Sequence, residues 1–302
     1  MFDLLDNLIW CIGCIILIIV GIKLIAGLYN IFGYFIDGSI DFKSYGKYAC
    51  VTGCTDGIGL EYAAQLARKG LDLILISRSK EKLEKLSISL QTQFKVKTEI
   101  IVADFTDPTI YSFLRKSLRN YDIGVLVNNV GMASSFPYYY YEYDHKYLIE
   151  IVNCNLLSAA MMSSIVYPQF IEKKKGILIN ITSASGFSPG IMGLPYAATK
   201  AAEQKFTEGL LLESALFSRD IIVQDVAPCY VASKLSQRTT VAYHIPTPEQ
   251  FVQSALKTVG RMPFTAGYFF HQIEHYLLRA FPNFIFNQFV LKNKLAKRAA
   301  TT

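Results

Sequence analysis

The chain has 302 residues, of which 52% are hydrophobic and 18% are charged, and its formal net charge is +6. A typical soluble domain carries about 25% charged residues, so a segment or much of the surface is expected to lie in membrane. No basic helix with interleaved aromatic residues is present, which excludes nucleic-acid binding of that kind. The basic runs at 173–175 and in the tail are either solvated surface or contacts to anionic lipid head groups.

The six cysteines are scattered along the chain and lie mostly within apolar runs. This distribution argues against a disulfide framework and indicates a reducing compartment around the globular part. Cys11 and Cys14 have C-x-x-C spacing, but they sit in an apolar run and are interpreted as small apolar residues.

Residues 8–28 form an apolar run in which Lys23 is the only charge. About 21 residues at a rise of ~1.5 Å would cross a hydrocarbon core of about 30 Å. A cleaved signal peptide is the alternative, but the chain begins with Asp3 and Asp6 where a signal peptide is basic. We therefore expect an uncleaved membrane anchor. Lys43 and Lys47 follow the run and no Lys or Arg precedes it, which predicts that the globular part faces the cytosol.

From residue 47 onward, strand-like apolar runs alternate with helical patterns. Repeated strand–helix–strand units predict an α/β fold with a doubly wound parallel sheet of the Rossmann type. Continuous apolar runs such as 221–223 fit strands that are buried on both faces. The expected strands are 48–52, 71–77, 98–103, 123–128, 176–182 and 221–226, and the expected helices are 57–69, 80–91, 108–119, 142–173 and 196–217.

The last part of the chain departs from this alternation. Residues 269–280 have apolar residues at helical spacing, which predicts an amphipathic helix against the core or in a membrane interface. Pro282 is expected to separate this helix from a second apolar piece at 284–291. We therefore divide the chain into a membrane anchor and linker (1–46), a catalytic domain (47–262) and an apolar C-terminal extension (263–302).

The segment from His271 to His275 matches H-x-x-E-H, a zinc-protease pattern. It lies on the aromatic helix expected at 269–280 and has no evident third ligand. We therefore expect no metal site there.

A glycine-rich turn joins the first expected strand to the first expected helix. Glycines at such a turn let the backbone approach a pyrophosphate, which the N-terminus of the following helix holds. The segment 52–59 predicts a dinucleotide-binding turn made by Gly53, Asp56, Gly57, Ile58 and Gly59.

Arg78 follows the second expected strand, where dinucleotide folds that bind NAD carry an acidic residue. A guanidinium suits a 2′-phosphate by charge and by its fork geometry, so the expected cofactor is NADPH. Asp104 ends the third strand, where its carboxylate would accept from the adenine amine, and Asn128 ends the fourth. Strand ends of this kind face the ligand in doubly wound sheets.

Tyr196 and Lys200 are four residues apart in an expected helix, so they lie on one face about one turn apart. Ser183 follows the apolar run 177–182 upstream. A hydroxyl at a strand end, with a phenol and an ammonium on the next helix, can donate a proton to a carbonyl.

Taken in order, these motifs resemble the short-chain dehydrogenase/reductase family. The patterns T-G-x-x-x-G-x-G, N-N-x-G, a serine and Y-x-x-x-K occur at family spacing over about residues 47–260. The segments that flank these motifs, together with the N-terminal anchor, resemble those of the 17β-hydroxysteroid dehydrogenase and very-long-chain 3-oxoacyl-CoA reductase group. The resemblance implies an NADPH-dependent enzyme of the endoplasmic reticulum membrane, in a family that often forms homodimers.

The resemblance also implies roles for individual residues. Tyr196 would protonate the developing alkoxide, and Lys200 would favour its phenolate form and hold the nicotinamide ribose. Ser183 would donate to the carbonyl oxygen. Asn155 matches the family's fourth catalytic residue and would hold a water behind Lys200, and Val231 would contact the cofactor.

The expected substrate is a lipid ketone. The apolar anchor and tail suggest a substrate that partitions into lipid. Two candidates have this property: a very-long-chain 3-oxoacyl-CoA, which is reduced during fatty-acid elongation, and a 17-ketosteroid. An inactive lipid-binding or scaffold homologue is the alternative from a different class.

Overall fold

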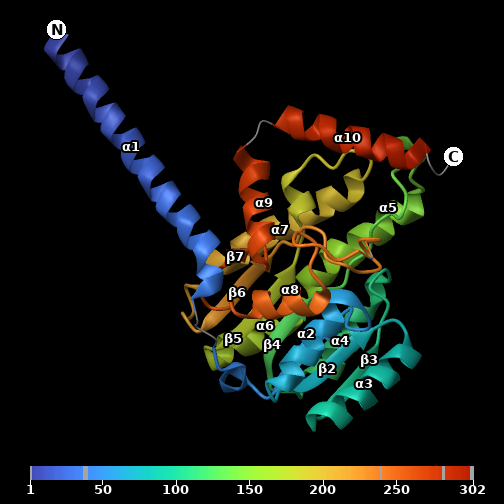
Figure 1. The fold of residues 1–302 in the computed structure, drawn as a ribbon. Helices are drawn as coiled ribbons and strands as arrows, with labels where there is room; N and C mark the ends of the chain where they lie inside the picture. Colours follow the sequence, from blue (N-terminus) through green and yellow to red (C-terminus); the bar gives the residue numbers. More distant parts are fainter. Residues whose placement is uncertain (1, 37–39, 239, 281–282, 300–302) are drawn as a thin grey trace.

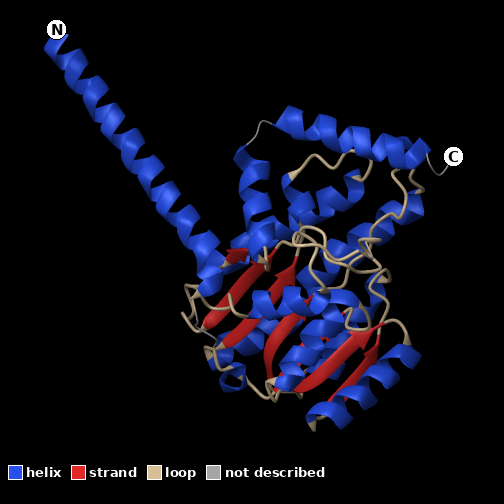
Figure 2. Ribbon diagram, viewed as in Figure 1, coloured by secondary structure: helices blue, strands red, loops and turns tan. Residues whose placement is uncertain are grey.

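The computed structural model describes residues 2–36, 40–238, 240–280 and 283–299. Its centre is a seven-stranded parallel sheet in the order β3-β2-β1-β4-β5-β6-β7 (Figure 2). The order reverses between β1 and β4, and a doubly wound sheet binds its ligand at such a switch point. The strands are β1 (Tyr48–Thr52), β2 (Asp72–Ser77), β3 (Thr98–Val102), β4 (Ile123–Asn128), β5 (Gly176–Ile181), β6 (Ile221–Val226) and β7 (Phe264–Thr265).

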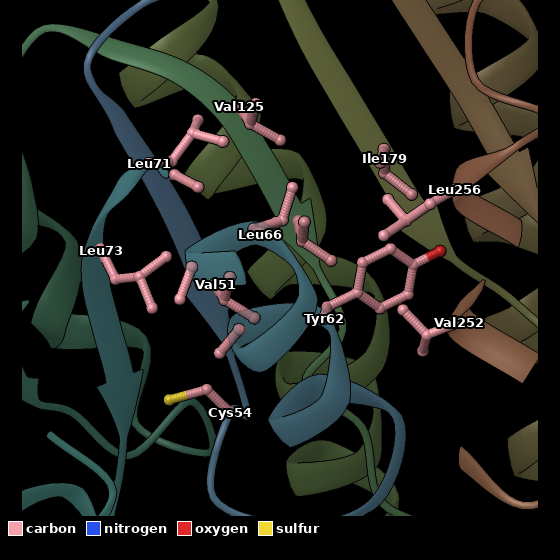
Figure 3. Close-up of a cluster of buried hydrophobic side chains, with 14 of the residues drawn as sticks. Val51, Cys54, Tyr62, Leu66, Leu71, Leu73, Val125, Ile179, Val252 and Leu256 are labelled. Carbon is pink, nitrogen blue, oxygen red and sulfur yellow. The ribbon is translucent and has the colours of Figure 1, made fainter. Parts of the chain in front are cut away.

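Helices cover both faces of this sheet, which confirms the expected doubly wound α/β fold. Every residue of β4 and β5 is buried, because both strands have helices above and below them. Figure 3 shows the apolar cluster on one face, where Tyr62 of α2 lies against Val252 and Leu256 of α8. The helices of the domain are α2 (Gly57–Arg68), α3 (Lys80–Phe94), α4 (Tyr111–Leu118), α5 (His145–Val152), α6 (Ser158–Lys173), α7 (Leu194–Ser214) and α8 (Pro248–Leu256).

Two elements of the domain lie outside the sequence prediction. Strand β7 is only two residues long and pairs with the end of β6, which leaves no periodicity to detect. Helix α8 begins inside a proline-containing segment that resembles a loop. Its start is a capping box, in which the Thr247 hydroxyl accepts from the Gln250 N–H and the Gln250 side chain accepts from the Thr247 N–H.

Helix α1 (Phe2–Phe32) projects away from the domain (Figure 1). Most of its apolar side chains are exposed, including Trp10 and Leu17. Within the described residues, Asp6–Phe35 and His145–Lys173 are long and apolar enough to cross a membrane, but half of the second stretch is buried in the domain core. Only the first stretch therefore presents an apolar surface that nothing in the described chain covers.

The base of α1 is fixed to helix α9 (Phe269–Ala280), which lies beside it in Figure 1. The Tyr34 hydroxyl lies 2.5 Å from the Thr265 hydroxyl and donates to Gln272 Oε1 at 3.2 Å. The rings of Phe35 and Phe269 meet edge to face at 5.0 Å. These contacts join the apolar helix to the edge of the sheet formed by β7.

The C-terminal helix α10 (Asn283–Ala299) is longer than the apolar piece expected at 284–291, and Pro282 lies outside the described residues. Its last turn contacts the loop after β4. Arg298 forms an ion pair with Glu142 at 2.5 Å, and Lys297 donates to the Ser135 carbonyl at 3.1 Å. Helix α10 thus lies across the top of the domain (Figure 1).

Candidate active site

Ser183 and Tyr196 come from neighbouring elements at the carboxyl end of β5. Ser183 follows the strand and is buried, and its Oγ accepts from the Ser185 N–H at 3.1 Å in a short 3₁₀ turn. Tyr196 lies in the first turn of α7 and is half-buried. The geometry leaves the Ser183 hydroxyl proton for a second partner, because the Ser185 contact uses only a lone pair of the oxygen.

Lys200 lies one turn further along α7 and is 3% exposed. Its Nζ donates to the Ile181 carbonyl at 2.8 Å and to Glu203 Oε2 at 2.7 Å. Burial lowers the pKa of the Lys200 amine, but the Glu203 carboxylate and the Tyr196 phenol oppose it, so the pKa is raised overall. The structure therefore holds a charged ammonium next to Tyr196.

Asn155 is placed by a π-helical turn, Asn153–Leu157, which interrupts the helix expected at 142–173. Such single turns are frequent at functional sites. The Asn155 amide donates to the Met132 carbonyl at 2.9 Å and to Thr199 Oγ1 at 3.1 Å, and its oxygen accepts from the Met132 N–H at 2.7 Å. Asn155 thus ties the loop after β4 to the helix that carries Tyr196 and Lys200.

Gly131 lies next to both Asn155 and Lys200. A Cβ at position 131 would lie 3.6 Å from Asn155 Oδ1 and 3.8 Å from Lys200 Nζ. The amide oxygen and the ammonium therefore border the same stretch of backbone, where an acceptor and a donor are available to a water or a ribose hydroxyl.

The glycine-rich turn is packed tightly against the loop after β4. A Cβ on Gly59 would lie 2.2 Å from Asn129 Nδ2, and a Cβ on Gly53 would lie 2.9 Å from the Val130 backbone. Asn129 donates from its side chain to the carbonyls of Thr52 and Gly53. The turn therefore keeps a backbone-lined cradle before the N-terminus of α2, which fits a pyrophosphate.

The other residues predicted for this turn have distinct surroundings. Ile58 is half-buried against the core, and Gly57 has a positive φ of 54°. The Asp56 carboxylate pairs with Lys234 at 2.8 Å, and Lys234 belongs to the segment after β6. Val231, in the same segment, is buried. The segment after β6 thus closes over the glycine-rich turn.

Arg78 is exposed at the end of β2, where its guanidinium has no hydrogen-bond acceptor within the part of the chain that the structure describes. Asp104 is also exposed, and one oxygen accepts from the N–H and hydroxyl of Thr106. Asn128 differs, because its amide donates to Asn180 Oδ1 at 2.9 Å inside the core. Its side chain therefore orders the interior, and Arg78 and Asp104 are the predicted groups that remain accessible.

The sequence analysis assigned no role to three polar residues that organise this site: Asn129, Thr199 and Glu203. Glu203 had a local signal, because it lies three residues after Lys200 and such positions are neighbours on a helix. Asn129 also had one, since it is the second asparagine of the N-N-x-G motif. Thr199 lies between Tyr196 and Lys200, but its hydrogen bond to Asn155 joins positions 44 residues apart, which no local pattern indicates.

The H-x-x-E-H segment lies on α9, where His271 Nε2 is 3.2 Å from the carbonyl oxygens of Tyr230 and His244. Among the described residues there is no group of three metal-ligating side chains. The histidine packs the C-terminal helix onto the segment after β6.

The profile of the short chain dehydrogenase family matches residues 47–243. The chain therefore belongs to the short-chain dehydrogenase/reductase family, as its motifs predict, and it is an oxidoreductase that uses a nicotinamide cofactor. The cradle at the glycine-rich turn and the polar groups beside Gly131 fit such a cofactor.

Two curated relatives cover most of this chain. A very-long-chain 3-oxoacyl-CoA reductase-B from Danio rerio is 38% identical over 85% of this chain and 83% of its own length. A hydroxysteroid dehydrogenase-like protein 1 from Gallus gallus is 40% identical over 83% of this chain and 77% of its own length. Among solved structures, a short-chain dehydrogenase from Sphingobium yanoikuyae in complex with NADPH aligns with a TM-score of 0.67 and 29% identity, covering 72% of this chain and 86% of its own.

Proposed function

We propose that this protein is a membrane-anchored, NADPH-dependent reductase of a lipid ketone, and that its substrate is a very-long-chain 3-oxoacyl-CoA in fatty-acid elongation. The observation that carries the proposal is the buried Lys200 ammonium beside Tyr196, in a domain whose base is joined to an exposed apolar helix. Similarity to proteins named very-long-chain 3-oxoacyl-CoA reductase supports the choice of substrate.

The reduced nicotinamide supplies a hydride to the carbonyl carbon when it is bound. Tyr196 then donates its phenolic proton to the developing alkoxide, and Ser183 donates to the same oxygen and fixes its position. Lys200 favours the phenolate that Tyr196 becomes, because an ammonium nearby stabilises the charged form. Asn155 holds the loop at Met132 and, with Lys200, borders the backbone at Gly131, where a relay water would bind.

The preference for NADPH rests on Arg78. Its exposed guanidinium stands at the end of β2, beside the cradle, with no acceptor in the described chain. A 2′-phosphate would supply that acceptor through a charge-assisted, bidentate hydrogen bond. Asp104, at the end of β3, is the acceptor assigned to the adenine amine.

Membrane attachment is assigned to the anchor and linker at residues 1–46, with the catalytic domain (47–262) on the cytosolic face of the endoplasmic reticulum. The C-terminal extension (263–302) packs α9 against the base of α1 and lays α10 over the domain. The attachment of α9 to the base of the exposed apolar helix supports entry of a long acyl chain from the side of the bilayer. We assign the active form as a homodimer, as is frequent in the family.

A 17-ketosteroid is the second candidate substrate, and similarity to a protein named hydroxysteroid dehydrogenase-like protein 1 favours it. The inactive homologue is disfavoured because Ser183, Tyr196 and Lys200 are all present and ordered in the site.

The test is an NADPH oxidation assay on purified membranes that contain the protein. A 3-oxoacyl-CoA with a long chain should support turnover at a kcat/KM at least about tenfold above a 17-ketosteroid. Preferred turnover of the steroid would replace the substrate assignment, and no turnover with any lipid ketone would favour the inactive homologue.

A further inference from the structure

A buried carboxylate that the proposed mechanism does not use lies against Lys200. Glu203 is three residues further along α7 and is 1% exposed. Its Oε2 accepts from Lys200 Nζ at 2.7 Å, and both side chains are almost completely removed from solvent. A charged pair with so little exposure is costly to bury, so its geometry is a candidate for a functional role.

The hydrogen bonds of Lys200 show what this carboxylate does to it. An ammonium carries three protons, and two of the three are taken by Glu203 and the Ile181 carbonyl. The third has no acceptor among the described residues, and Gly131, where a Cβ would lie 3.8 Å from Nζ, borders the amine. Glu203 and Ile181 therefore leave one proton of Lys200 for a cofactor ribose or a relay water.

The charge of the ammonium also depends on Glu203. Desolvation favours the neutral amine, and an adjacent carboxylate favours the ammonium. Other ionisable groups near Lys200 are Tyr196 on α7, Cys154 on the π-helical turn and Asp225 on β6. Asp225 is hydrogen-bonded to Thr182 and also lies near Arg279 of α9, so Glu203 is the acid in direct contact with the amine.

We infer that Glu203 is a positioning residue of the active site, whose carboxylate keeps Lys200 charged and directed at the cofactor side. The inference rests on the roles proposed for Tyr196 and Lys200. Burial raises the pKa of the Glu203 carboxyl, although Lys200 opposes that effect. The support that the carboxylate gives to Lys200 should therefore be weaker in acid solution and stronger in alkaline solution.

The first measurement compares the wild type with Glu203→Gln, which removes the charge and keeps the shape. In the oxidation of a 3-hydroxyacyl-CoA by NADP⁺, kcat of the variant should match wild type within about twofold at pH 6. In alkaline solution its kcat should fall at lower pH than that of wild type, with the alkaline limb of the pH profile displaced downward by about one unit, the effect of one pKa unit at Lys200. Glu203→Asp, which restores a carboxylate, should reverse part of the displacement. An equal loss of kcat at every pH, or no displacement, would overturn the inference.

The second measurement uses the cofactor-free protein and needs no turnover. Brief labelling with acetic anhydride modifies neutral amines, and mass spectrometry gives the extent at Lys200. Glu203→Gln should increase labelling at pH 9 about tenfold, whereas Asp225→Asn, the matched control, should change it less than about threefold. Unchanged labelling in Glu203→Gln would contradict the inference even if wild-type activity confirms the proposed reductase. Absence of wild-type activity would instead count against the reductase itself.

Discussion

The groups around Lys200 and the attachment of helix α10 are held in different ways. Lys200, Glu203 and Asn155 are buried: Lys200 donates to Ile181 of β5 and to Glu203 on its own helix, and Asn155 donates to Thr199 of α7, at 2.7–3.1 Å. Arg298 and Glu142, which attach α10, are about a quarter exposed. The hydrogen bonds at Lys200 are therefore shielded from water, whereas the ion pair that attaches α10 is partly screened by it. Changes at Lys200 and its partners should have large effects, and changes at the attachment of α10 should have small ones.

The largest effect is expected for Tyr196→Phe, because this change removes the proposed proton donor and keeps the ring. The rate of 3-oxoacyl-CoA reduction should fall at least about a thousandfold, or about 4 kcal/mol of transition-state stabilisation. The Kd for NADPH, measured by fluorescence, should change less than about twofold. Residual activity above about a tenth of wild type would remove Tyr196 from the mechanism.

The next effect concerns the packing of α9 and is a change in stability with pH. Burial lowers the pKa of the His271 imidazole to about 4 from its ordinary 6.5. Between those values the unfolded chain binds more protons than the folded protein. The stability that His271 contributes is thus complete above pH 6.5 and is lost as pH falls toward 4, by about 3 kcal/mol.

Chemical unfolding of the detergent-solubilised protein at several pH values between 7 and 4.5 would measure this. The slope of the unfolding free energy against pH gives the number of protons taken up on unfolding. His271→Gln should reduce that number by up to about one. A substitution of the exposed His145 is the control and should leave it unchanged. An unaltered pH dependence in His271→Gln would show that His271 does not titrate on unfolding.

Cofactor choice should depend on Arg78 to an intermediate extent. Arg78→Ala should raise KM for NADPH about thirtyfold, or about 2 kcal/mol, since a charge-assisted hydrogen bond is lost. KM for NADH should stay within about twofold, because NADH has no 2′-phosphate. Steady-state kinetics with both cofactors measures this. A parallel rise for both cofactors would place Arg78 outside 2′-phosphate recognition.

The smallest effect is expected at the attachment of α10. Arg298→Gln and Glu142→Gln should each change KM for a long-chain substrate by about threefold or less, and the double variant should change it no more than either single one. The value of kcat should remain unchanged in all three variants. A loss of kcat would show that α10 acts on the chemistry and not only on access.

The sequence predicts the sheet well and also suggests the candidate catalytic residues, because both depend on local spacing. The alternation of apolar strands and helices identifies six strands, and Tyr196 and Lys200 follow from one helical turn. Strand β7 escapes prediction because two residues have no period. The role of Thr199 escapes prediction because its hydrogen bond to Asn155 joins positions 44 residues apart. Glu203 could have been predicted to lie beside Lys200 from its spacing on the helix, but it belongs to none of the motifs.

Isotope transfer tests the central claim most directly. NADPH carrying two deuterium atoms at C4 of the nicotinamide is incubated with a long-chain 3-oxoacyl-CoA and the membrane-bound protein, and the product is examined by mass spectrometry. Wild type should yield a 3-hydroxyacyl-CoA with deuterium on carbon 3, and Tyr196→Phe should yield almost none. A product without deuterium, or equal transfer by the two proteins, would contradict the proposed hydride transfer at Tyr196.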